Sequence, residues 1–335
     1  MGAFDLAIEL GTTHTIIYKR GLGVVVNEPS LVALQLNGKK REFKCVGDAA
    51  AEFIKNPDNT IQVYEPIVEG VIINKQLATM MLKEFFKKVE ITRPSRLKVA
   101  ISIPVGATQK DRAELLSLAY GLNFHSVILI PSGIASLVGM QVDLANGISH
   151  MVVNIGGGVS DISIITGGTI VRGGSVTIGG NSLLKIIDQY LREERSLIVK
   201  DCDKKTLLNE LVSLYENDAN ELKLTCVDSD TKKQKLAIIT AKELYSITKF
   251  FFEKLVDCIA TMLNMSSSEV IADISRYGIY ICGELCNITG LDIFLSNNLH
   301  YPIYIQPDSH STTIYGLGAI IENKQLLELA LSNMA

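Results

Sequence analysis

The 335-residue sequence has no tryptophan and only five histidines, none of them close to another in the chain. No apolar run approaches the roughly 20 residues that a membrane-spanning helix needs. There is no basic tail, and a net charge of −4 gives no electrostatic reason for binding nucleic acid. We therefore expect no transmembrane helix, no nucleic-acid partner and no catalytic histidine.

The cysteines give no sign of a metal site. The six are Cys45, Cys202, Cys226, Cys258, Cys282 and Cys286. Cys282 and Cys286 lack the second cysteine pair or nearby histidines that zinc requires. Because no N-terminal signal is evident, we expect free thiols in a reduced, cytoplasmic setting.

A glycine triplet is the most informative local feature. Residues 151–166 read as an apolar strand, a turn at Gly156, Gly157 and Gly158, and a second strand of alternating polarity. Glycines leave no Cβ between the backbone N–H groups and a ligand, as a phosphate-binding turn requires. A turn that needs glycine only for its geometry is the alternative interpretation.

A second copy of this pattern lies near the N-terminus, at residues 4–18. Glu9 aligns with Asn154, and Gly11 aligns with Gly156. Two such units about half a chain apart predict two related lobes that face one another across a cleft. Strands alternate with helices in both halves, which predicts an α/β fold with mainly parallel sheets.

These motifs resemble those of the MreB family of actin-like ATPases, from about Phe4 to Ile321. The resemblance is carried by residues 9–12, 23–30, 69–72, 103–108 and 154–158. It implies a two-lobed, ribonuclease H-like fold with duplicated domains. Lobe I would be residues 1–140, with a small subdomain at about 31–70, completed by 310–335. Lobe II would be residues 141–309, with a small subdomain at about 182–242.

The resemblance also implies that ATP or ADP binds with Mg²⁺ between the lobes. The matching nucleotide-binding positions are Gly11, Thr12, Thr13, Gly156, Gly157, Gly158, Glu210, Gly283 and Glu284. Glu9, Asn154 and Asp161 would hold Mg²⁺ through water molecules. Because Mg²⁺ keeps several waters, only one or two carboxylates are needed.

Several catalytic positions depart from the family pattern. Glu9, Asn154 and Asn74 each stand where the family has an aspartate. The acidic pair that includes the water-orienting glutamate is replaced by Pro131 and Ser132. No convincing catalytic residue is left, so we expect an ATPase fold with slow or absent hydrolysis.

The adenosine side is altered as well. Leu208 replaces a lysine of the family. Glu284 and Leu285 replace two glycines of a family triplet, so we expect the side chains at these two positions to narrow or reshape the adenine slot. Asn181 is expected to cap the helix that follows the glycine pair Gly179-Gly180.

Three functions remain open. The resemblance implies an MreB-type cytoskeletal protein that forms head-to-tail filaments with itself and acts in cell shape. The alternative is a catalytically inactive scaffold or adaptor that binds a partner or an active paralogue. A small-molecule kinase is disfavoured, since no catalytic base is evident.

Contact with the inner face of the membrane is a further open question. Arg93 and Arg96 are charged, so the loop that contains them is expected to be solvated rather than bound to lipid headgroups. The first strand is expected to begin after three residues, which leaves no room for an amphipathic anchoring helix before it.

Overall fold

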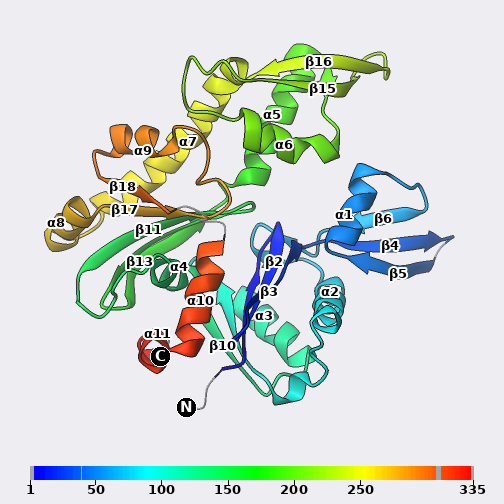
Figure 1. Cartoon of the computed structure of the whole chain (residues 1–335). Helices are drawn as coiled ribbons and strands as arrows, with labels where there is room; N and C mark the ends of the chain where they lie inside the picture. The colour runs from blue at the N-terminus through cyan, green and yellow to red at the C-terminus, as the bar shows by residue number, and fades with distance from the viewer. Residues whose placement is uncertain (1–3, 39, 307–310, 333–335) are drawn as a thin grey trace.

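Two five-stranded sheets with the same strand order form the framework of the protein (Figure 1). The structure, a computed structural model, describes residues 4–38, 40–306 and 311–332. The first sheet runs in the order β10 (Ser126–Pro131), β9 (Lys98–Ile103), β1 (Leu6–Leu10), β2 (His14–Lys19), β3 (Gly23–Pro29). The second sheet matches it as β18 (Ile303–Ile305), β17 (Ile279–Cys282), β11 (Ser149–Ile155), β12 (Ser160–Thr166), β13 (Thr169–Val176). The predicted duplication and two-lobed α/β fold are confirmed.

Each sheet is mixed, so the prediction of mainly parallel sheets is wrong. In lobe I, β1, β2 and β3 pair antiparallel, whereas β1, β9 and β10 pair parallel. In lobe II, β11, β12 and β13 likewise pair antiparallel, whereas β11, β17 and β18 pair parallel. The cause is local, because the short turns after β1 and β11 allow only hairpins, while helical crossovers lead to the parallel strands.

A small subdomain extends from each lobe, and Figure 1 shows both on the same side of the molecule. The first contains β4 (Val32–Asn37), β5 (Lys40–Val46), β6 (Ile61–Tyr64) and α1 (Asp48–Lys55). The second contains β14 (Leu197–Ile198), β15 (Glu221–Asp228), β16 (Gln234–Thr240) and α6 (Asp201–Leu211). Helices α1 and α6 contact one another, so the subdomains meet.

The remaining helices cover the sheets. They are α2 (Lys75–Lys88), α3 (Gln109–Gly121), α4 (Ser132–Gly139), α5 (Gly180–Arg195), α7 (Ala241–Asn264), α8 (Ser268–Tyr277), α9 (Leu291–Leu299), α10 (Thr312–Glu322) and α11 (Lys324–Ser332). A short hairpin of β7 (Ile67–Val68) and β8 (Val71–Ile72) precedes α2, and a 3₁₀ turn, η1 (Pro94–Arg96), precedes β9. None of the helices in the described part of the chain is long and apolar enough to cross a bilayer.

Helix ends follow local capping rules in part. Thr108 and Asp111 form the predicted capping box of α3. Asn74 accepts a hydrogen bond from the N–H of Leu77 and caps α2, so this departure from the family has a structural role. The prediction for Asn181 is wrong, because α5 begins at Gly180, two residues earlier than predicted, and Gly179 is its cap.

The two lobes join where α4 packs against α10, with α4 on β11 of lobe II and α10 on β1 of lobe I. A Cβ on Gly316 would lie 1.7 Å from the carbonyl oxygen of Ala135, and one on Gly139 would lie 2.0 Å from that of Thr312. Glycine is therefore required at both positions for the helix backbones to touch. Residues of both sheets, among them Ala7 and Val152, share one buried cluster with these helices.

The lobe and subdomain limits given above remain our assignment. The two five-stranded sheets span residues 6–131 and 149–305, and α10 returns to lobe I, where it packs on β1. Residues 1–3, 39, 307–310 and 333–335 of the assigned lobes lie outside the described residues.

Candidate nucleotide site

The glycine turn of lobe II, residues 156–158, is held from behind by helix α5. The carbonyls of Gly156 and Gly157 accept hydrogen bonds of 3.1 Å and 2.7 Å from the first amides of α5, those of Gly180 and Asn181. In a trans peptide the N–H points opposite to the C=O, so the amides of Gly157 and Gly158 face away from α5. Neither amide donates to another group among the described residues. The turn thus offers two N–H groups to an anion.

The turn of lobe I, residues 11–13, is held by Ser30. The Ser30 hydroxyl donates to the carbonyl of Gly11 over 2.7 Å, and its N–H donates to the carbonyl of Thr13 over 2.9 Å. Ser30 is buried and its hydroxyl also contacts that of Thr15. Residues 23–30 resemble a segment of the family, but no role for Ser30 was predicted from the sequence. Its role is to shape the first turn.

The two turns face one another across a cavity of about 360 Å³. Most of the predicted site residues line it: Glu9, Gly11, Thr12, Thr13, Ser132, Asn154, Gly156, Gly157, Gly158, Asp161, Gly283 and Glu284. Pro131 ends β10 beside it, whereas Glu210 is exposed on α6 and does not line it. From the same helix, Lys205 and Asn209 line the cavity instead.

Glycine is required at the second turn because the lobes touch there. A Cβ on Gly157 would lie 2.3 Å from Cγ2 of Thr13, and one on Gly158 would lie 2.4 Å from Oγ1 of Thr12. Thr12 Oγ1 also accepts a hydrogen bond of 2.9 Å from the N–H of Gly70, in the β7–β8 hairpin. The threonine hydroxyls and the glycine amides therefore converge on one place.

Asp161 is a buried carboxylate that joins the two lobes. It lies on β12 of lobe II and accepts hydrogen bonds from the hydroxyl of Ser132 and the backbone of Val105 in lobe I. The Ser175 hydroxyl of lobe II donates to its other oxygen, and accepts from the N–H of Gly106 over 2.9 Å. Burial raises the pKa of Asp161, while the hydrogen bonds from Ser132, Ser175 and Val105 oppose that rise.

Glu9 is the second buried carboxylate of the cleft, and it has no such donors. Its Oε2 atom is buried and has no hydrogen-bond partner among the described residues. Burial raises the pKa of Glu9 to about 8. An unpaired buried oxygen beside a cavity fits a cation, so Glu9 can hold Mg²⁺ or its water shell.

Asn154 is held by lobe I through its amide nitrogen. Its Nδ2 donates to Oγ1 of Thr313 over 3.1 Å, and Thr313 contacts the hydroxyl of Ser136 over 3.0 Å. No three His, Cys, Asp or Glu side chains come together as a metal site in residues 4–38, 40–306 and 311–332. Mg²⁺ held through water molecules by Glu9, Asn154 and Asp161 stays a prediction, and all three residues line the cavity.

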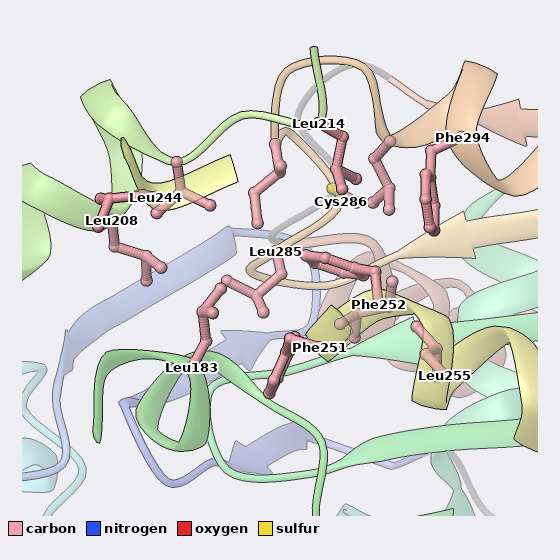
Figure 2. Packing of buried hydrophobic residues seen from close by; sticks show 14 of the residues in the cluster. Leu183, Leu208, Leu214, Leu244, Phe251, Phe252, Leu255, Leu285, Cys286 and Phe294 are labelled. Atoms are coloured by element: carbon pink, nitrogen blue, oxygen red, sulfur yellow. The ribbon is translucent and has the colours of Figure 1, made fainter. Parts of the chain in front are cut away.

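On the adenosine side of the cleft, the expectation that Leu285 narrows the adenine slot is wrong. Leu285 is 1 % exposed and does not narrow the slot, because it points into the core of lobe II, as does Leu208 (Figure 2). A Cβ on Gly180 would lie 3.4 Å from both leucines, at the start of α5. Of Leu208, Glu284 and Leu285, only Glu284 lines the cavity.

Two lobes of the same strand order, each supplying one turn to a shared cleft, define an actin-like protein. The family model for the MreB/Mbl protein matches residues 3–329, and the chain belongs to this family. It is 28 % identical to the cell shape-determining protein MreB of Escherichia coli over 324 residues, covering 95 % of this chain and 93 % of that protein. It is 25 % identical to the cell shape-determining protein Mbl of Bacillus subtilis, covering 98 % of each.

Solved structures agree with this assignment. MreB5 of Spiroplasma citri bound to AMPPNP superposes with a TM-score of 0.90 at 26 % identity, covering 98 % of both chains. The same protein bound to ADP gives a TM-score of 0.89. A MamK double helical filament gives 0.79 at 18 % identity, covering 95 % of this chain and 99 % of that one, which supports the fold alone.

Proposed function

We propose that this protein forms filaments in a cell-shape cytoskeleton, and that it binds ATP or ADP with Mg²⁺ while hydrolysing ATP slowly or not at all. The observation that carries the proposal is the pair of amides of Gly157 and Gly158, which lie in the cleft beside Thr12 and Thr13 and have no acceptor among the described residues. Such a group of N–H and O–H donors binds phosphate oxygens. MreB5 of Spiroplasma citri, a relative with the same fold, was solved with AMPPNP and with ADP.

Slow hydrolysis follows from Ser132. By resemblance, Pro131 and Ser132 replace the acidic pair that contains the water-orienting glutamate, and the Ser132 hydroxyl donates a hydrogen bond to Asp161. A serine hydroxyl cannot accept a proton from water at neutral pH, and losing such a group costs roughly 10²–10⁴ in rate. Mg²⁺, when bound, would neutralise phosphate charge beside Glu9.

Calorimetry tests the binding. Titration of ATP and of ADP with Mg²⁺ should show binding, and phosphate release from the same sample should be slow. Lys205→Gln should weaken ADP binding about threefold to tenfold, because it removes a cation from the cleft lining. Lys232→Gln, on an exposed loop of the same subdomain, is the matched control. No binding at millimolar nucleotide would refute the nucleotide part of the proposal.

Sedimentation tests the filament. Pelleting should begin above a threshold protein concentration and rise with concentration, as expected for head-to-tail assembly. A protein that stays in the supernatant at every concentration, with or without nucleotide, would instead be the adaptor of the alternative hypothesis.

A further inference from the structure

Glu284 lies on a loop whose backbone is tightly fixed. Gly283, directly before it, has a φ of +98°, and a Cβ there would lie 2.6 Å from the carbonyl oxygen of Ile155. The N–H of Leu285 donates to that same carbonyl over 3.0 Å. Because these contacts fix the residues on both sides, the Glu284 side chain leaves the loop in the direction of the glycine turn.

The Glu284 carboxylate lies against that turn. A Cβ on Gly157 would lie 2.5 Å from Oε2 of Glu284, so the carboxylate oxygen rests over the glycine. Oε2 is buried, and it has no hydrogen-bond partner among the described residues. A buried carboxylate oxygen without a donor is unfavourable, so packing alone does not explain a glutamate here.

The lining of the cleft offers little positive charge to balance Glu284. The basic side chains in its described lining are His14 and Lys205. A nucleotide phosphate that approaches Gly157 and Gly158 therefore meets a carboxylate of like charge at the turn itself.

We propose that Glu284 is a built-in competitor of nucleotide phosphate that sets the affinity of the cleft. Its carboxylate stands against Gly157, in the turn whose amides a phosphate would use, and must be displaced or screened by a cation before phosphate binds. Nucleotide affinity is therefore low for this fold and depends strongly on Mg²⁺. This inference rests on the proposed nucleotide-binding function.

The test compares Glu284→Gln and Glu284→Gly with the wild type in calorimetric titrations of ADP, with Mg²⁺ and with EDTA. Removing one like charge beside a diphosphate should tighten ADP binding about tenfold in both variants. The gain should be larger in EDTA, because no cation then screens the wild-type carboxylate. Glu216→Gln removes an exposed charge from lobe II and should leave the affinity unchanged.

The outcomes separate this inference from the function on which it rests. If the wild type binds ADP and both variants bind within twofold of it, the inference is overturned and the function stands. Weaker binding by the variants also overturns it, since Glu284 would then be a ligand. If only the variants bind, the inference holds and native nucleotide binding is refuted. If no form binds while melting temperatures match, both fail.

Discussion

Glu9 and Asp161 are carboxylates buried in the same cleft, yet their surroundings are opposite. Asp161 accepts hydrogen bonds from Ser132, Ser175 and the backbone of Val105, which come from both lobes. Glu9 has a buried oxygen with no partner among the described residues. Donors stabilise the ionised form of a buried carboxylate, so Asp161 can be a fixed part of the lobe interface. Glu9 can be ionised at low cost only when a cation is present.

The comparison therefore separates a structural carboxylate from one that is suited to an ion. The first connects the lobes whether or not the cleft is filled, because all its donors are protein groups. The second has a buried oxygen with no donor among the described residues, and nothing opposes the burial that raises its pKa to about 8. Three experiments test this difference between Glu9 and Asp161.

The largest effect is expected from pH acting on Glu9. Its folded pKa is about 8 and its usual value is 4.5, so between these pH values the folded state holds a proton that the unfolded state has lost. The contribution of Glu9 to stability should therefore fall as pH rises from about 4.5 to 8, by on the order of 5 kcal/mol in all. Thermal melts without Mg²⁺ measure this slope.

Glu9→Gln is the control for that experiment, since a neutral amide should remove most of the slope. Saturating Mg²⁺ with ADP should also flatten it, because a cation favours the ionised form of Glu9. A wild-type slope equal to that of Glu9→Gln would show that Glu9 has a donor in solution, and the contrast with Asp161 would be lost.

Asp161→Ala should destabilise the protein by about 3 kcal/mol, because it leaves the hydroxyls of Ser132 and Ser175 and the Val105 amide without their acceptor. Denaturant unfolding measures the loss. Asp257→Ala, on the exposed face of α7, is the matched control and should change stability little. A loss no larger than that of the control would mean that Asp161 does not connect the lobes.

The sequence predicted what is encoded locally. The glycine turn, its copy at residues 11–13 and the capping box of Thr108 with Asp111 all follow from short patterns. Together with the family resemblance these were enough for the two-lobed fold and for most of the cleft lining. The mixed sheets were missed, although the hairpins that cause them had been predicted.

Long-range contacts could not be predicted in the same way. Ser132 and Asp161 lie 29 positions apart, and nothing in the neighbourhood of either in the chain predicts their hydrogen bond. Leu285 points into the core of lobe II rather than into the slot, because its amide is bound to Ile155 and its side chain joins the cluster around Leu208. The direction of a side chain on a loop depends on what packs behind it, and a single sequence does not show this.

Ser132→Ala should give the smallest effect and is the finest test of the comparison. It removes one donor from Asp161 and leaves Ser175 and Val105 in place, so the loss should be about 1 kcal/mol. The pKa of Asp161 should rise further, because one of the hydrogen bonds that lower it is gone. If the melting temperature falls as far as in Asp161→Ala, then Ser132 alone connects lobe I to Asp161. If it does not fall at all, the Ser132 hydroxyl is free to contact a ligand, and the replacement of the family's acidic pair by Pro131 and Ser132 would matter for chemistry more than for folding.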